Sequence, residues 1–416
     1  MPLKVVVVGA GLGGLGAAIA LNQCGHDVLV LEQSRFLHEV GAAIHVAPNA
    51  TRILESWGVD FEALQAVRCK QVQIWDEMAN PKWGPVITKD LRESLGIYDD
   101  WFLTHRVDLH NALRAAAAKE VDGKSVNVRL SSRVASVDSE AGVVKLENGT
   151  TITGDLIIGA DGMHSKSVSA VTGEVGKKES TGQNCFRFLI PVSKLRSNAL
   201  TATLLEKIGL DGVNAFIAPD RRILVYPCRG GSLLNIAAIF PSDPSVPVTD
   251  SSWFESASID DLLKTYQRFC PELRELCRLA EDVKLWSLAC RCPPRTFVKG
   301  KLALVGDAAH PTLPHQGQGG AQALEDGVAL GALFPQETTP EQVSKRLSIY
   351  NKTRYDHAIT VMIVSKVPSD LREQVLEELH TYVPTAEIPE DMYAFNWSSY
   401  PAQKALDLLA AAEMDP

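Results

Sequence analysis

The sequence has neither a hydrophobic run long enough to cross a membrane nor an excess of positive charge. A membrane-spanning helix needs about 20 mostly apolar residues. The apolar run near the amino terminus, Val5–Val8, is far shorter and is followed by glycines. The 50 acidic residues outnumber the 41 basic ones and give a net charge of -9, which argues against nucleic acids and anionic membranes as partners. Because no cleavable leader is recognised, we expect a cytoplasmic protein.

Cysteine pairs with the spacing of a metal or redox site are also missing. The eight cysteines lie at positions 24, 69, 185, 228, 270, 277, 290 and 292, and no two of them form a C-x-x-C pair. Zinc and thioredoxin-type chemistry are therefore not expected, and scattered thiols are typical of a reducing compartment. Between His310 and His315 lie Pro311 and Pro314, which prevent a shared helix face, so we expect no metal ion.

The composition that remains is that of an ordinary globular protein. With 416 residues, 45% of them hydrophobic and 22% charged, the chain is long enough for about two or three domains and needs no disulfide. Its first clear pattern is a buried strand over Leu3–Val8, a glycine-rich turn, a helix over Leu15–Leu21 and a second strand over Asp27–Leu31. This order predicts a βαβ unit with parallel strands.

A different pattern occupies the middle of the chain. Strand-like runs recur between turn residues from about residue 181 to residue 240, which is typical of an antiparallel sheet. Apolar strands with glycine turns occur before this block, at Gly154–Gly162, and after it, at Leu302–Val305. We therefore predict an α/β fold with a discontinuous Rossmann-like nucleotide-binding domain. It comprises residues 1–68, 99–178 and 288–366, the inserted mostly antiparallel substrate-binding sheet domain comprises residues 69–98 and 179–287, and a C-terminal helical segment comprises residues 367–416.

The glycine turn after the first strand carries a nucleotide-binding pattern. Gly9, Gly11 and Gly14 form G-x-G-x-x-G between a strand and a helix, where missing side chains let backbone N–H groups and the helix dipole approach a pyrophosphate. Glu32 ends the second strand, where a carboxylate can accept hydrogen bonds from ribose hydroxyls. Glycine-rich turns also occur in ordinary loops, but the order of elements favours a dinucleotide with free ribose hydroxyls, FAD or NAD rather than NADP.

Three separated segments together resemble one enzyme family. The opening glycine turn, GADG at Gly159–Gly162 and LVGDAAHPTLPHQGQGGAQALEDG at Leu304–Gly327 are similar to the signatures of FAD-dependent aromatic-ring hydroxylases, the single-component flavoprotein monooxygenases. EVGAAIHVAPNATRILESWG at Glu39–Gly58 and HRVDLHNAL at His105–Leu113 resemble the salicylate hydroxylase branch, which includes many fungal natural-product enzymes. The resemblance covers most of residues 1–365 and does not extend into the helical segment that follows.

The resemblance implies a bound FAD and assigns residues to it. Asp307 would bind the ribityl chain, Asp161 both FAD and the nicotinamide reductant, and Arg35 and Arg106 the adenosine and pyrophosphate portions. A helix beginning near Gly319 would direct its positive end toward the flavin. The expected cofactor-binding residues are Gly9, Gly11, Gly14, Glu32, Arg35, Ala43, Arg106, Asp161, Asp307, Gly319 and Gly320. Two alternatives stay open: Asp307 could also cap a helix, and Arg35 could be a solvated loop charge.

The expected catalytic residues are His45, Arg187, Tyr226 and Pro314. His45 lies in a segment that resembles the strand beside the flavin. Its imidazole could remove a proton from a phenol or enol, or it could be a strand histidine bonded to the backbone. Arg187 and Tyr226 resemble substrate anchors of the fungal branch and would bind an anionic oxygen; the alternatives are a strand-edge charge and a core aromatic. Pro314 resembles the proline that lines the oxygen side of the flavin.

The same resemblance implies a reaction. NADPH or NADH reduces FAD, O2 adds to the reduced flavin, and the C4a-hydroperoxide delivers one oxygen atom to an electron-rich aromatic substrate, phenolic or hydroxybenzoate-like. No second nucleotide-binding unit is recognised, so the nicotinamide would bind transiently. Alternatives are 2,3-epoxidation of an indole alkaloid, a flavin dehydrogenase or reductase, and a binding module without activity. The absence of a W-x-W-x-I-P segment argues against a halogenase. We expect a monomer or a homodimer.

Overall fold

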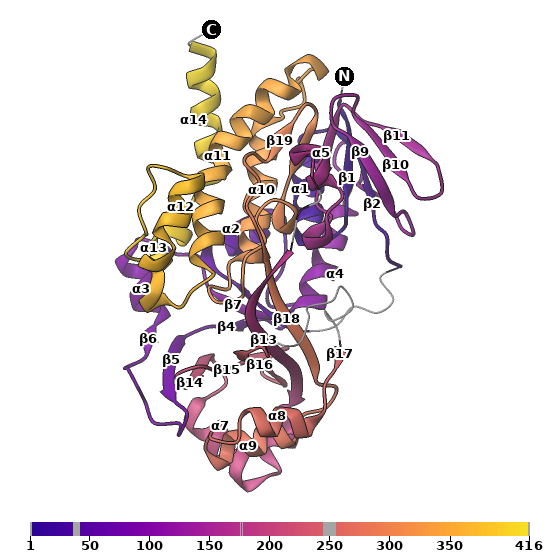
Figure 1. Ribbon diagram of the computed structural model, residues 1–416. Coiled ribbons are helices and arrows are strands. Elements are labelled where there is room, and N and C mark those ends of the chain that lie inside the picture. The colour runs from indigo at the N-terminus through magenta and orange to yellow at the C-terminus, as the bar shows by residue number, and fades with distance from the viewer. Residues whose placement is uncertain (1, 36–41, 175, 177, 244–254, 415–416) are drawn as a thin grey trace.

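Parallel strands form the first of the two large sheets of the protein (Figure 1). The computed structural model describes residues 2–35, 42–174, 176, 178–243 and 255–414. The strand order is β19-β20-β12-β1-β2-β8. The strands are β1 (Lys4–Val8), β2 (Asp27–Leu31), β8 (Asn127–Arg129), β12 (Leu156–Gly159), β19 (Val298–Lys299) and β20 (Leu302–Leu304). Neighbouring strands are parallel except β19 and β20. The predicted βαβ unit is confirmed, with β1 and β2 paired and joined by α1 (Leu12–Gln23).

Protein covers both faces of this sheet, which explains the apolar runs of its strands. Successive side chains of a strand point to opposite faces, and all four valines of β1 are buried. Three helices contribute to the core on this sheet, and the first of them, α1, packs against the other two. They are α1, α4 (Arg106–Ala117) and α10 (Gly319–Leu333). The same core includes a small antiparallel sheet and a short helix: β9 (Val134–Asp138), β10 (Val143–Leu146), β11 (Thr151–Thr153) and α5 (Ser167–Thr172).

The second large sheet has eight strands in the order β17-β18-β13-β16-β15-β14-β5-β6 and lies below the first in Figure 1. Its strands are β5 (Gln71–Asp76), β6 (Val86–Ile87), β13 (Lys178–Pro191), β14 (Gly212–Ile217), β15 (Arg222–Cys228), β16 (Leu233–Pro241), β17 (Glu255–Ser256) and β18 (Lys284–Arg291). The pairings are antiparallel except for β5 with β14. The predicted antiparallel block is therefore confirmed, whereas the domain boundaries stay a prediction.

Four helices cover one face of the eight-stranded sheet. They are α6 (Val192–Arg196), α7 (Ala199–Ile208), α8 (Ile259–Thr265) and α9 (Pro271–Arg278). Alternate residues such as Phe186, Phe188, Ile223 and Val225 form a hydrophobic core with these helices. The side chains between them, which point the other way, are therefore available to line a site on the opposite face.

A third, small sheet connects this opposite face to the nucleotide-binding half. It consists of β3 (Ala43–Val46), β7 (Phe102–His105) and β4 (Val67–Arg68). The Tyr226 hydroxyl donates to the carbonyl oxygen of Ala43 at 3.0 Å, and the N–H of Ala43 donates to the side-chain oxygen of Asn235, also at 3.0 Å. Two residues of the large sheet thus bind the backbone of β3 at one position.

Helices complete the carboxyl-terminal part of the chain, as predicted. They are α11 (Val343–Val364), α12 (Leu376–Tyr382), α13 (Met392–Trp397) and α14 (Pro401–Met414). The remaining elements are α2 (Pro48–Ser56), α3 (Thr88–Ser94) and the 3-10 turns η1 (Gly162–His164), η3 (Gly306–Ala308), η4 (Pro340–Gln342) and η5 (Ser369–Val375). The helix α14 packs on α10 and α11, and its end extends from the body (Figure 1). Among the described residues, no helix has the length and apolar character that a membrane crossing requires.

Candidate active site

The carboxyl ends of four adjacent parallel strands bring the predicted nucleotide-binding residues to one edge of the first sheet. The glycine turn follows β1, Glu32 follows β2, Asp161 follows β12, and Asp307 follows β20. Backbone hydrogen bonds of 2.8 to 3.0 Å tie each strand end to its neighbour. Ligands of open α/β sheets bind in this position.

The three glycines of the first turn have different geometric roles. Gly9 has a φ of +101°, and a Cβ there would lie 2.5 Å from the carbonyl oxygen of Ala160. A Cβ on Gly14 would lie 2.0 Å from the carbonyl oxygen of Gly9. A Cβ on Gly11, however, would meet no atom within 4 Å. The space above Gly11, at the N-terminus of α1, is therefore open and fits a pyrophosphate group.

Glu32 organises this turn through its carboxylate. One oxygen accepts from the N–H of Ala10 at 2.8 Å, and the other accepts from the N–H of Ser34 at 2.7 Å. An ionised carboxylate has about four acceptor positions, so capacity for ribose hydroxyls remains. Arg35 is exposed. Residues 39–41, which begin one of the segments of the family resemblance, lie outside the described residues.

Asp307 is a solvent-exposed acid at the end of a buried strand. Its side chain is exposed to solvent, yet burial among the surrounding protein atoms raises its pKa, while the charges of His310, Arg291 and Arg106 oppose this rise. Solvent reaches the Asp307 side chain although many protein atoms lie near it, so a bound ligand can cover this side chain. The half-buried Arg106, at the start of α4, contributes positive charge near Asp307.

Asp161 shapes the neighbouring turn. Its carboxylate accepts from the Ser165 hydroxyl at 2.6 Å and from the N–H groups of Lys166 and Ser167 at 2.7 and 3.0 Å. Both oxygens therefore hold the chain at the start of α5, and direct contact with FAD or nicotinamide stays a prediction.

Arg291 is a residue of this site that the sequence did not reveal. It is buried at the end of β18 and donates to the carbonyl oxygens of Asp307 and Ala308 at 3.2 and 2.5 Å. Burial lowers its pKa, and the charges of Asp307 and Asp161 oppose this. The guanidinium is thus hydrogen-bonded to the Asp307 turn and is close enough to Asp161 to interact with its charge. Its segment, CRCPP, contains no recognisable motif, so only the structure identifies it.

The N-terminus of α10 lies beside β3. A Cβ on Gly320 would lie 3.2 Å from a side-chain carbon of Ile44, and one on Gly317 would lie 3.3 Å from the His45 side chain. Gly319 begins the helix without a side-chain cap, so the N–H groups of the first turn and the positive end of the helix dipole are available to a negatively charged group. Pro314, half-buried, is in the loop that leads to this turn.

Three predicted catalytic residues meet at this point. The ring centroids of His45 and Tyr226 are 4.5 Å apart. Burial and the nearby charge of Arg187 lower the pKa of His45 to about 4. No hydrogen bond to a ring nitrogen of His45 is found among the described residues, so the backbone-bonded alternative is not observed there. The Arg187 guanidinium lies 5.4 Å from the ring of Trp286.

Tyr226 has a specific partner within the protein. Its hydroxyl donates its only proton to the backbone of Ala43, and burial raises its pKa well above the usual value. In this arrangement it can accept a hydrogen bond from a substrate but cannot donate one.

A pairing between Arg222 and His315 was also not predicted from the sequence. The Arg222 guanidinium donates to Nδ1 of His315, which lies in the loop after Pro314. Burial and this charge lower the pKa of His315 to about 3, so the imidazole is neutral. The alternation of β15 places Arg222 on the same side as Tyr226. This alternation could have placed Arg222 on the site-facing side of β15 from the sequence.

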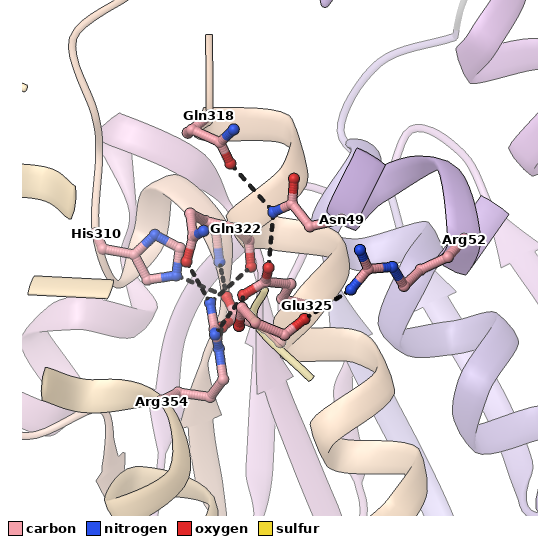
Figure 2. Close-up of polar contacts among 10 residues, drawn as sticks. Asn49, Arg52, His310, Gln318, Gln322, Glu325 and Arg354 are labelled. Atoms are coloured by element: carbon pink, nitrogen blue, oxygen red, sulfur yellow. Dashed lines mark hydrogen bonds and ion pairs between the residues drawn. The ribbon is translucent and has the colours of Figure 1, made fainter. Parts of the chain in front are cut away.

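A buried polar network supports the site from behind (Figure 2). Arg354 on α11 donates to Glu325 and Asp326 on α10 at 2.6 and 2.8 Å. Asp326 also accepts from His310 at 2.7 Å and from the N–H of Gly306 at 2.8 Å, so it holds the turn that carries Asp307. No sequence pattern indicated this network.

The network also includes residues outside α10 and α11. Asn49 on α2 donates to Glu325 at 2.7 Å and to Gln318, which precedes α10, at 3.1 Å (Figure 2). The Ser399 hydroxyl donates to Glu325 at 3.2 Å. The guanidinium of Arg52 donates to the carbonyl oxygens of Ser399 and Trp397 at 3.1 and 2.7 Å.

The C-terminal segment reaches the aromatic wall beside His45. Trp397 packs edge-on against Trp101, with ring centroids 5.5 Å apart, and Trp101 lies 5.6 Å from His45. Trp397 is almost fully buried. A segment far along the chain therefore forms part of the support of the site.

Comparisons with known proteins identify the family. The family described as "FAD binding domain" matches residues 2–365. The chain is 36% identical over 369 residues to hispidin-3-hydroxylase of Neonothopanus nambi, covering 86% of each chain. It is 31% identical over 417 residues to the FAD-dependent monooxygenase cfoG of Aspergillus candidus, covering 98% of this chain and 95% of the relative. A solved salicylate hydroxylase substrate complex has a TM-score of 0.76 at 23% identity, covering 98% of both chains, and thus the same fold.

The chain therefore belongs to the FAD-binding family of monooxygenases and hydroxylases, and it is an FAD-dependent monooxygenase. The predicted family, α/β fold and FAD cofactor are confirmed. The described residues also fit the cofactor, because the open space at Gly11 and the solvent-exposed side chain of Asp307 lie at one edge of the sheet.

Proposed function

We propose that the protein inserts one oxygen atom from O2 into a phenolic or hydroxybenzoate-like aromatic compound, with NADPH or NADH as the transient reductant. The observation that supports this proposal is the meeting of His45, Arg187 and Tyr226 beside the N-terminal turn of α10. FAD, when bound, supplies the redox and oxygen chemistry. The relative whose name, hispidin-3-hydroxylase, indicates a hydroxylation also supports it.

Arg187 would bind and activate the substrate. Among the described residues, no carboxylate forms an ion pair with it, so its charge is available to an anionic oxygen. A phenol has a pKa near that of tyrosine, about 10. A positive charge within a few ångströms favours the phenolate, which makes the ring more electron-rich.

His45 would act as a hydrogen-bond partner of the substrate rather than as a strong base. With a pKa of about 4, neutral imidazole is a much weaker base than phenolate. The charge of Arg187 lowers the affinity of His45 for a proton and stabilises a deprotonated substrate at the same time. Tyr226 would fix β3, and hence His45, and could accept from a substrate hydroxyl.

The remaining expected residues would hold the cofactor and exclude water. Gly9, Gly11 and Gly14 would place the N-terminus of α1 at the pyrophosphate. The other proposed contacts with FAD are Glu32 for ribose, Arg35 and Arg106 for the adenosine and pyrophosphate portions, Asp161 and Asp307 for the central part of FAD, and Ala43, Gly319 and Gly320 for the ring. Pro314 would line the oxygen side. A cytoplasmic location and a monomer or homodimer stay predictions.

A screen that detects oxygenated product tests this proposal. The holoenzyme is incubated with a phenolic panel and an indole panel, NADPH or NADH, and isotopically labelled O2, and products are analysed by mass spectrometry. One labelled oxygen in a phenolic product is expected. Labelled product from indoles alone would favour indole epoxidation, and reductant consumption without product in both panels would favour a reductase; either result overturns the proposal.

A further inference from the structure

Two arginines lie on the same face of the eight-stranded sheet. Across β13, β16 and β15, one row of paired residues consists of Cys185, Ile239 and Arg222. The next row on the same face consists of Arg187, Ala237 and Leu224. With about 4.8 Å between strands and about 3.4 Å per residue, the Cα atoms of Arg187 and Arg222 are about 12 Å apart. Only the small side chain of Ala237 separates Arg187 from Leu224 in its row. Both guanidinium groups can therefore reach one ligand.

Neither arginine has an acidic partner among the described residues. Arg222 is mostly buried, and the sole hydrogen-bond partner of its guanidinium within the described chain is His315. The Arg187 side chain interacts with Cys185 and Trp286, and its charge acts on His45 and Tyr226, none of which is an acid. A buried cation without a counter-ion is unfavourable, so an anion would complete this arrangement.

His315 is a weak partner that an anion can replace. Its imidazole is neutral and offers one acceptor nitrogen to a guanidinium with five N–H donors. Hydrogen bonds from arginine to an ionised oxygen are roughly twice as strong as those between neutral groups, and a carboxylate can bind two N–H groups together. Exchange of His315 for an anionic oxygen is therefore favourable.

We propose that Arg222 forms a second anion subsite, so that the substrate is a small planar aromatic compound with two acidic oxygen groups, one bound by Arg187 and the other by Arg222 in place of His315. This inference rests on the proposed function, since it names the substrate class of the same site. A neutral indole offers no group to either arginine and is disfavoured. Arg222 is thus a specificity-determining residue.

Equilibrium binding to the oxidised holoenzyme, without reductant, tests the subsite separately from turnover. The probes are benzene-1,4-dicarboxylate and its monomethyl ester, which have the same ring but two charges and one. Isothermal titration calorimetry is expected to show that the wild-type enzyme binds the dianion at least about tenfold more tightly. In Arg222→Gln this preference falls to within about twofold, because the monoanion keeps its contact with Arg187.

The matched control is Arg221→Gln. Arg221 lies immediately before β15, carries the same charge as Arg222 and pairs with Asp220, so its removal leaves the dianion preference unchanged. Arg222→Lys retains part of the preference, and His315→Phe binds the dianion at least as tightly as the wild type. FAD content and circular dichroism confirm folding.

Three results would overturn the inference: no dianion preference in the wild-type enzyme, an equal loss for both probes in Arg222→Gln, or a preference retained in that variant. Absence of oxygenated product in the substrate screen would affect only the proposed function, because no turnover is needed for binding.

Discussion

The guanidinium Nε of Arg354 lies 2.8 Å from a carboxylate oxygen of Asp326, and both side chains are buried. Burial would raise the pKa of Asp326, but His310 and Arg354 lower it below its usual value. Asp326 therefore remains ionised and keeps its hydrogen bond to the backbone of Gly306. A charge pair in the interior thus fixes the turn that presents Asp307.

Replacing Arg354 by methionine should destabilise the protein by about 3–5 kcal/mol, because Glu325 and Asp326 lose the cation that compensates them. FAD content should fall with it, since the Asp307 turn loses its support. Urea unfolding and the flavin absorbance of the purified protein measure the two effects. Lys352→Met, an exposed change on the same helix, is the control; equal stability of both variants would contradict the prediction.

The glycine turn predicts opposite behaviour for two alanine substitutions. Gly11→Ala adds a Cβ that meets nothing, so the fold should persist while FAD affinity falls at least about tenfold, because the methyl group occupies the position expected for the pyrophosphate. Gly14→Ala should disrupt the fold itself, since its Cβ would lie 2.0 Å from a backbone oxygen. Thermal unfolding of the apoprotein and FAD titration separate the two outcomes. Full FAD affinity in Gly11→Ala would show that the nucleotide lies elsewhere.

Arg52 should stabilise the C-terminal segment. Arg52→Ala removes two hydrogen bonds to backbone carbonyls and the pair with Asp99, and we expect a loss of about 1–3 kcal/mol. Because Trp397 then loses a constraint, the KM for the aromatic substrate should rise more than kcat changes. Arg68→Ala removes the more exposed pair with Asp100 and should cost at most about 1 kcal/mol. If both variants lose the same stability, the assignment fails.

Buried neutral histidines should make the protein sensitive to acid. Burial, more than the nearby positive charges, lowers the pKa of His45 to about 4 and those of His315 and His357 to about 3. The unfolded chain, with histidine pKa values near 6.5, binds more protons below that pH. The free energy of unfolding should therefore decrease as the pH falls from about 6.5 towards 4, by about 1.4 kcal/mol per pH unit for each histidine.

His357→Phe tests this outside the active site. The ring of His357 stacks on Phe395 with centroids 4.3 Å apart, and phenylalanine preserves that contact without a titrating group. The loss of unfolding free energy between pH 7 and pH 5, measured by urea denaturation, should be about 2 kcal/mol smaller than in the wild type. Identical losses would refute the assignment.

Local patterns allowed the nucleotide-binding half to be predicted from the sequence. A buried strand, its glycine turn and the following helix are contiguous, and carboxyl ends of parallel strands meet at one edge. Glu32, Asp161 and Asp307 could therefore be placed together before the structure was known.

Contacts between distant segments could not be predicted in this way. Arg222 and His315 are 93 residues apart, and their contact depends on how β15 lies against the loop after β20. The proton of Tyr226 goes to Ala43, 183 residues away. Periodicity gives the face on which such a side chain lies, but not the strand or loop opposite to it.

The two hydrogen bonds that Asn235 and Tyr226 make with Ala43 have a mechanical consequence. They anchor the strand of His45 to the same sheet that carries Arg187, so His45 and Arg187 belong to one rigid unit. Any hinge movement that admits a ligand would then increase the distance between this unit and the nucleotide, while the distance between His45 and Arg187 stays constant.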